Sequence, residues 1–188
     1  MGKTETARIF AGLGIPVYDA DAAVHTLYEP GGAAGVPIAA AFSGVVRDGR
    51  VDRAALAAVV LGNPAAHAKL ESIVHPLAAQ AQRLFIAQHM SAEMIVFDIP
   101  LLFETGGDSR MDMVIVVSAP PEIQRARALA RPGMTEEKLT HILARQMSDT
   151  DKCLLADYVV DTAQGFAHAE DQVLKIVAAL KARRNSHA

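Results

Sequence analysis

The hydrophobic positions along the chain follow two patterns, one with the period of a helix and one of short apolar runs. Thr6, Phe10 and Leu13 recur at helical spacing, and Gly12 and Gly14 close this first predicted helix. The apolar runs predict strands, and the run of residues 94–99 has the composition of a strand buried on both faces. These runs are residues 15–18, 94–99, 113–117 and 158–161. Because strands alternate with helical segments, we predict an α/β fold with a parallel, doubly wound sheet.

A long helical block separates the first predicted strand from the second. Asp52 is expected to cap a helix over residues 53–61, and Asn63-Pro64 to start the next, since a capping residue there precedes a proline at the first helical position. The residue before a proline is pushed out of helical geometry, so we expect this helix to end at about Val74, before Pro76. Because strands flank the block, we predict that it is an insertion covering one side of a site. Its other expected helices are residues 22–29, 33–42 and a segment ending at about Met90.

Three further helices are predicted in the last part of the chain. Pro120-Pro121 opens the first, and Pro132-Gly133 ends it. Thr135 begins the second, since a threonine followed by two acidic residues favours a helix N-terminus, and this helix is expected to include Arg145. An amphipathic helix over about 166–184 closes the chain. The first of the three carries Arg125, Arg127 and Arg131.

Composition narrows the class of protein. A chain of 188 residues, 51% of them hydrophobic and none of them Trp, suits one helix-rich domain with an inserted subdomain. The net charge of −3 gives no reason to expect a nucleic-acid or membrane-surface partner, and no apolar run is long enough to cross a bilayer. Cys153 is the only cysteine, which excludes an internal disulfide and fits a cytoplasmic location.

The first residues carry a candidate phosphate site. Gly2-Lys3-Thr4 matches the last part of the phosphate-binding loop pattern G-x-x-x-x-G-K-[ST], in which the lysine reaches the phosphates and the hydroxyl ligates Mg²⁺. The helix that follows would direct its free N–H groups and positive dipole end at the phosphates. In the full pattern a buried strand and Gly-x-x-x precede these residues, and Met1 stands at the last variable position. We expect a start assigned too late or a fragment, with poor solubility and little activity because neighbouring strands would lack ladder partners.

Two carboxylates follow the first predicted strand. Asp19 and Asp21 stand where that strand ends, and ligands of open α/β sheets bind beyond the carboxyl ends of strands. They are therefore expected to face the same crevice as Lys3. From the residues alone, Asp21 is either a functional carboxylate or the N-cap of the next helix.

Nearly the whole chain resembles one family, the dephospho-coenzyme A kinases, which are small P-loop kinases. No single element is decisive, but their order and spacing are specific. The matching elements are Gly2-Lys3-Thr4, residues 13–21 (LGIPVYDAD), Glu29-Pro30-Gly31, Val74-His75-Pro76, residues 98–104 (DIPLLFE), Gln124-Arg125-Ala126-Arg127, Arg131, and residues 156–161 (ADYVVD). The chain departs from the family at its start, where the first strand and leading loop glycine are missing.

The resemblance implies an enzyme that phosphorylates the ribose 3′-hydroxyl of dephospho-coenzyme A with ATP and Mg²⁺, the last step of coenzyme A synthesis. It implies a P-loop kinase-like three-layer fold with a helical insertion and a small lid. Residues 1–24 and 91–188 would form the nucleotide-binding core, with the lid at about 127–149, and residues 25–90 the helical coenzyme A-binding subdomain.

The resemblance also implies roles for individual residues. Lys3 and Asp21 would be catalytic, Asp21 as acceptor of the 3′-hydroxyl proton, with Asp19 as its neighbour. Thr4 and Asp98 would hold the metal, although Asp98 is equally compatible with a structural acceptor. The expected ATP contacts are Met1, Gly2, Lys3, Thr4, Glu5, Arg127, Arg131 and Arg145, and the expected substrate contacts are Asp19, Asp21, His75, Pro76, Leu101 and Glu104.

Several alternatives remain open at this stage. The arginines could be solvated helix charges, although the planar guanidinium suits phosphate. His75-Pro76 could be a helix break with a packed histidine. Another small P-loop kinase, acting on nucleotides or small alcohols, would share the loop and the arginines, and an inactive truncated chain would bind ligands weakly. The oligomeric state is not indicated by the sequence.

Overall fold

The computed structural model describes residues 2–186, which fall into two compact units. Within the described residues, one unit comprises residues 2–17 and 100–186, and the other residues 18–99. Within the described residues the strands pair two by two: β1 with β4, β2 with β3, and β5 with β6. No helix of the described chain is both long and apolar enough to cross a membrane.

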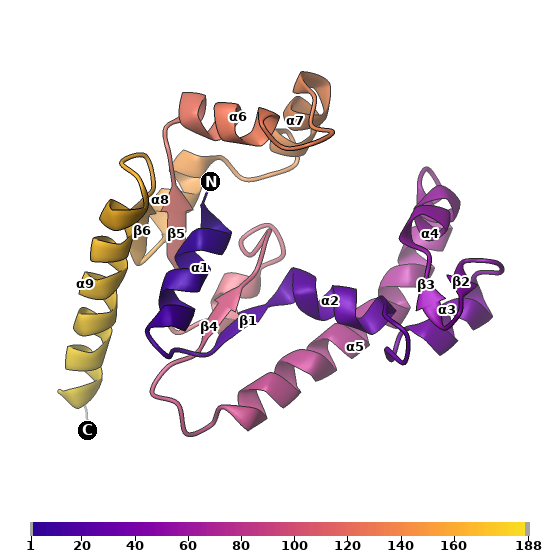
Figure 1. Cartoon of the computed structure of the whole chain (residues 1–188), viewed down its shortest axis with the longest axis horizontal. Helices are drawn as coiled ribbons and strands as arrows, with labels where there is room; N and C mark the ends of the chain where they lie inside the picture. The colour runs from indigo at the N-terminus through magenta and orange to yellow at the C-terminus, as the bar shows by residue number, and fades with distance from the viewer. Residues whose placement is uncertain (1, 187–188) are drawn as a thin grey trace. The chain divides into compact units, whose positions relative to one another are not determined.

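The first unit is built on a pair of parallel strands (Figure 1). Ile115 to Ser118 on β5 lie opposite Tyr158 to Asp161 on β6, in register one to one. This confirms the predicted α/β class with parallel strands. The elements of the unit are α1 (Lys3–Gly12), η1 (Gly107–Arg110), β5 (Ile115–Ser118), α6 (Pro121–Leu129), α7 (Glu136–Leu143), α8 (Asp149–Leu155), β6 (Tyr158–Asp161) and α9 (Phe166–Asn185).

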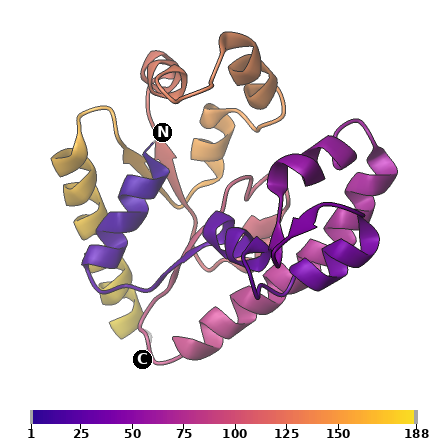
Figure 2. The ribbon, with the colours of Figure 1, turned by 45° about the vertical axis from the view of Figure 1, so that its right-hand side comes forward.

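Helices α1 and α9 lie side by side in this unit, as Figures 1 and 2 both show. Of the three positions that predicted α1, Thr6 and Phe10 are buried, each 3% exposed, whereas Leu13 caps the end of the helix and is 42% exposed. Ile9, which was not among them, is also buried. From α9, Val173 and Ile176 are buried in the same way. Burial of side chains of this size contributes about 1.5–3 kcal/mol each, so packing rather than helix propensity holds α1 in place.

The second unit is mainly helical, with α2, α3 and α4 packed against the long helix α5 (Figure 2). Its apolar core includes Ile38, Val45 and Leu56. The elements are β1 (Val17–Asp19), which starts at the last residue of the first unit, α2 (Ala20–Tyr28), α3 (Gly35–Ala41), β2 (Val46–Arg47), β3 (Arg50–Val51), α4 (Arg53–Val60), α5 (Pro64–Gln88) and β4 (Val96–Asp98).

Two predicted helix starts in this unit are confirmed by their caps. The Asp52 carboxylate accepts hydrogen bonds from the N–H groups of Ala54 and Ala55, both at 3.0 Å. The Asn63 side chain accepts from Ala66 N–H at 3.1 Å, and Pro64 is the first residue of α5. Each cap satisfies N–H groups that a helix leaves without partners in its first turn.

The predicted end of that helix before Pro76 is wrong, because α5 continues through it to Gln88. Pro76 has no N–H to donate to the Ser72 carbonyl. Ser72 lies on an exposed face of the helix, where water can replace the lost hydrogen bond. On the opposite side, Val74 is buried, and Leu70 and Leu77 pack against the apolar core. This packing outweighs the local preference against a helix around proline.

Smaller differences concern turns. Residues 46–51, for which no element was predicted, form a hairpin whose turn residues Asp48 and Gly49 both have positive φ. Asp-Gly is the preferred pair for such a turn. Arg145 lies outside α7, which ends at Leu143, because the Arg145 N–H turns back to the Ile142 carbonyl.

Replacing Pro76 with Ala should stabilise the protein. The variant restores one helical N–H and removes the ring clash, which outweighs the smaller gain that proline gives by restricting the unfolded chain, so we expect a net gain of about 1–2 kcal/mol. Thermal unfolding of Pro76→Ala measures this, with Pro64→Ala as the matched control. Pro64 stands at the first helical position, where proline is tolerated, so the control should change little. A lower melting temperature for Pro76→Ala would contradict the account of α5.

Candidate active site

Gly2 forms the N-terminus of α1, and its conformation requires glycine. Its φ of 92° lies in the left-handed region. A Cβ at this position would lie 3.1 Å from Cγ2 and 3.3 Å from Cβ of Thr162, a residue just after β6. Both the backbone angle and the close approach therefore disfavour a side chain at this position. Among the described residues no side chain caps α1, and the N-terminus of a helix is suited to binding an anion.

The other predicted phosphate residues occupy the first turn of α1. Lys3 begins the helix, and the Thr4 side chain is exposed. The Glu5 carboxylate pairs with Arg8 one turn further along, at 2.5 Å. Met1, assigned to the same group, lies outside the described residues. The structure thus places Gly2, Lys3 and Thr4 together at one helix end.

Arg127 is held beside this helix end through Thr162. One guanidinium nitrogen donates to the Thr162 hydroxyl at 3.0 Å, and the other donates to the Thr162 carbonyl at 2.8 Å. Thr162 is itself fixed to the end of β5, because its N–H and its hydroxyl both donate to the Ser118 carbonyl at 3.0 Å. Arg127 and the N-terminus of α1 therefore share one neighbour, Thr162.

Arg127 and Arg125 lie on the same helix but differ in the partners of their guanidinium groups. The Arg125 guanidinium pairs with the Glu136 carboxylate on α7. In the part of the chain that the structure describes, no carboxylate is paired with Arg127, although its side chain is half-buried. A cation beside the positive end of a helix dipole is unfavourable unless an anion joins them. This arrangement therefore suits phosphate.

Arg131 and Arg145 lie elsewhere. Each is exposed on the turn that follows a helix, Arg131 after α6 and Arg145 after α7. Their proposed contacts with ATP remain predictions.

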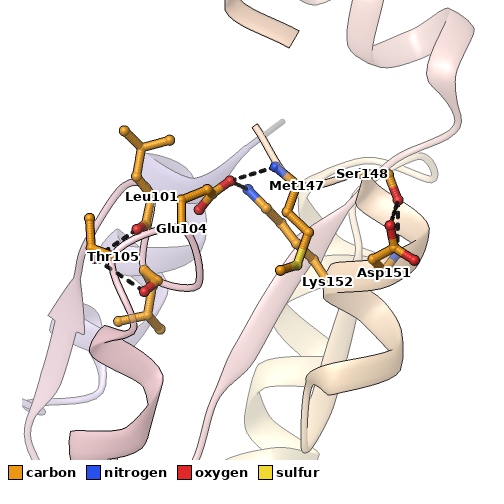
Figure 3. Close-up of polar contacts among 8 residues, drawn as sticks. Leu101, Glu104, Thr105, Met147, Ser148, Asp151 and Lys152 are labelled. Atoms are coloured by element: carbon orange, nitrogen blue, oxygen red, sulfur yellow. Dashed lines mark hydrogen bonds and ion pairs between the residues drawn. The ribbon is translucent and has the colours of Figure 1, made fainter. Parts of the chain in front are cut away.

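The loop after β4 carries Leu101 and Glu104. Leu101 has a φ of 57°, which is rare for a leucine, and its carbonyl accepts a bond from the Thr105 hydroxyl at 2.9 Å. Figure 3 shows the Met147 N–H and the Lys152 ammonium converging on one carboxylate oxygen of Glu104, at 2.9 and 2.8 Å. Glu104 thus ties this loop to α8 and to the turn before it.

The environment of Glu104 favours its charged form. Its side chain and that of Lys152 are only 16% and 15% exposed. Burial by itself raises the pKa of the Glu104 carboxyl, but the hydrogen bonds from Lys152 and Met147 N–H and the charge of Lys152 outweigh it, so the pKa is lowered. The ion pair is therefore kept at neutral pH.

Asp19 and Asp21 belong to the second unit and differ in their local bonding. Asp19 ends β1 and caps α2, its carboxylate accepting from Ala22 N–H at 2.9 Å. Asp21 lies in the first turn of the same helix and is exposed. The alternative interpretation of Asp21 as the N-cap is therefore wrong, since Asp19 performs that function.

Three other predicted residues also lie in the second unit. Asp98 is the last residue of β4 and is 7% exposed. His75 and Pro76 lie within α5 and are exposed. His75 is therefore neither at a helix break nor packed in the core.

Thr162 and Lys152 were not identified from the sequence. For Thr162 a signal existed, since a polar residue directly after a predicted parallel strand stands where ligands of α/β sheets bind. For Lys152 no comparable signal existed, because its pairing with Glu104 joins positions 48 apart in sequence.

Comparison with known proteins places this geometry in a family. A sequence profile described as dephospho-CoA kinase matches residues 1–168. The chain is 52% identical over 188 residues to a dephospho-CoA kinase of Mesorhizobium japonicum, covering 99% of this chain and 94% of that protein. It is 51% identical to one of Agrobacterium fabrum, covering 97% of this chain and 94% of that protein.

Two solved structures share the fold of this chain. TT1252 from Thermus thermophilus superposes with a TM-score of 0.79 at 31% identity, covering 95% of this chain and 91% of that chain. A dephospho-CoA kinase from Campylobacter jejuni superposes with a TM-score of 0.67 at 21% identity, with the same coverage of 95% and 91%. The second likeness concerns the fold alone.

Replacing Glu104 with Gln should make the stability of the protein less dependent on pH in the acid range. Because the folded-state pKa of Glu104 is lowered, its ion pair stabilises the protein above the ordinary carboxyl value of 4.5, and this contribution is lost as the pH falls through the folded value. We expect Glu104→Gln to cost about 1–3 kcal/mol at neutral pH and much less in acid. Melting curves from about pH 3 to pH 7 measure the difference.

Glu136→Gln is the matched control for this experiment. It removes an exposed ion pair, that with Arg125, and such pairs contribute little. A difference between wild type and Glu104→Gln that is constant over the pH range would contradict the account of Glu104.

Proposed function

The chain belongs to the dephospho-CoA kinase family, and from that premise we propose that it transfers the terminal phosphoryl group of ATP to the ribose 3′-hydroxyl of dephospho-CoA. The products are coenzyme A and ADP, which makes this the last step of coenzyme A synthesis. About 50% identity to dephospho-CoA kinases over more than 95% of the chain supports this substrate. The free thiol of Cys153 supports a reducing, cytoplasmic location.

We propose that ATP phosphates bind at the N-terminus of α1. The observation that carries this assignment is Arg127, held through Thr162 beside Gly2 without a carboxylate partner in the described chain. Phosphoryl transfer needs charge neutralisation on the phosphates more than any covalent help. The N–H groups of α1, the Lys3 ammonium and the Arg127 guanidinium would supply it.

The residues proposed for Mg²⁺ fit that ion in their chemistry. Thr4 offers an exposed hydroxyl, and Asp98 a carboxylate at a strand end. Mg²⁺ prefers oxygen ligands and takes few from the protein, keeping waters and substrate phosphates for the rest. The described residues contain no cluster of three or more His, Cys, Asp or Glu that could hold a metal ion. When bound, the ion would neutralise phosphate charge.

On the acceptor side we propose Asp21 as the group that takes the 3′-hydroxyl proton. Its carboxylate is exposed, whereas that of Asp19 is engaged in capping α2. Asp19 would therefore fix the start of α2 and, with it, the backbone that carries Asp21. A positioned general base contributes about 10²–10⁴ in rate.

We propose the remaining substrate contacts from the family resemblance. His75 and Pro76 present exposed side chains on α5 to the coenzyme A moiety. Leu101 is 41% exposed on a loop that Glu104 anchors to α8, so the anchor would keep the Leu101 contact in place. Residues 127–149, with Arg131 and Arg145 on exposed turns, would act as a lid over ATP.

Substitution of Lys3 tests the function directly. Lys3→Met removes a charge matched to the transition state, so kcat should fall by about 10²–10³ or more, with a smaller effect on substrate binding. The assay is ADP release with dephospho-CoA, with nucleoside monophosphates and small alcohols as alternative acceptors. Lys181→Met on α9 is the control. Turnover of Lys3→Met near that of wild type, or a preference for another acceptor, would contradict the proposal.

The paired substitutions at Asp21 and Asp19 test the base. Asp21→Asn is nearly isosteric and should lower kcat by about 10²–10⁴ while leaving the melting temperature unchanged. Asp19→Asn should reduce kcat less, because asparagine also caps helices. If Asp19→Asn were the more damaging change, the roles of the two carboxylates would be reversed.

A further inference from the structure

We propose that Thr162 is a positioning residue, which holds Arg127 against the N-terminus of α1 so that both act on the same phosphates. The inference rests on the proposed function, since it assumes that Arg127 contacts ATP. It adds a residue that binds no substrate and acts through Arg127.

The hydroxyl of Thr162 has a fixed orientation. It has a single hydrogen, which it donates to the Ser118 carbonyl at 3.0 Å. Its lone pairs are then directed at the Arg127 nitrogen, 3.0 Å away. Because the residue is 7% exposed, little water competes for this bond. The hydroxyl is therefore a preorganised acceptor for the guanidinium.

The guanidinium is bound in two places. One nitrogen reaches the hydroxyl and the other reaches the carbonyl of the same residue, at 2.8 Å. This two-point contact fixes the plane of the guanidinium, whereas one bond would let it rotate. Arg127 has no carboxylate partner in the described chain, and its two hydrogen bonds to Thr162 restrain its side chain.

The methyl side of Thr162 faces Gly2. The position that a Gly2 Cβ would take lies 3.1 Å from Cγ2, 3.3 Å from Cβ and 3.4 Å from the hydroxyl oxygen of Thr162, so this side chain lies against the start of α1 with its methyl group nearest. One residue thus lies against the helix end, with its methyl group nearest, and accepts hydrogen bonds from Arg127 through its hydroxyl and carbonyl oxygens. The two groups proposed to bind phosphate are therefore placed relative to each other by Thr162.

Substituting Thr162 with valine and with serine tests separately what its hydroxyl and its methyl group contribute. Thr162→Val keeps the shape and the methyl but removes the hydroxyl, and the Ser118 carbonyl still accepts from the residue 162 N–H. Thr162→Ser keeps the hydroxyl and removes the methyl. We expect Thr162→Val to weaken binding of a non-hydrolysable ATP analogue and to lower kcat/KM for ATP about tenfold, with KM for dephospho-CoA unchanged. Thr162→Ser should restore most of both.

A double-mutant cycle with Arg127→Ala tests whether Thr162 acts through Arg127. Calorimetric titration with the ATP analogue and steady-state kinetics are measured for wild type, Thr162→Val, Arg127→Ala and the double variant, and melting curves check that each folds. We expect the Thr162→Val effect to disappear in the Arg127→Ala background, since the hydroxyl then has no guanidinium to hold.

The outcomes separate this inference from the proposed function. Additive effects of the two substitutions, an equal loss for dephospho-CoA, or no rescue by Thr162→Ser would overturn the role of Thr162 and leave Arg127 as an ATP ligand. Arg127→Ala with unchanged ATP binding, or wild type that does not bind the analogue, would instead overturn the proposed phosphate site, and the role of Thr162 with it.

Discussion

The parallel pairing of β5 and β6 is the constraint on which the candidate phosphate site depends. Its register sets Ser118 opposite Asp161, so that the next residue, Thr162, bonds through both its N–H and its hydroxyl to the Ser118 carbonyl. From this strand end one residue contacts the start of α1 and Arg127 together. Because backbone pairing depends little on side-chain identity, it thereby fixes the position of Arg127 relative to the positive N-terminus of α1.

In the second unit, helix α5 positions the candidate residues His75 and Pro76. It continues through Pro76 because one face is packed against the apolar core, and it presents His75 and Pro76 on the other. A proline in a helix interior removes one hydrogen bond and is tolerated only where packing compensates. The cost in stability is local, and the exposed proline face is the part that we propose contacts the substrate. Sites of function often carry such locally unfavourable features.

Much of the fold was predictable because its signals are local. Periodic apolar residues and capping side chains gave α1, α4 and the start of α5, and the apolar run at 158–161 gave β6 without error. The Asp48-Gly49 turn was also readable, although the hairpin was not predicted. The errors at Pro76 and Arg145 arose where packing or the last helical turn outweighed a local preference.

By itself the sequence determined the α/β class, the family, and the residue types able to bind phosphate, because motifs and short-range periodicity are written along the chain. The tertiary structure decided which of these groups are combined. In the folded protein Asp19 rather than Asp21 caps α2, and Glu104 is paired with Lys152. Among the described residues, Arg125 is paired with a carboxylate and Arg127 is not. The physical reason is that partners of charges and hydrogen-bonding groups are set by strand pairing and helix packing between distant segments, which no local pattern records.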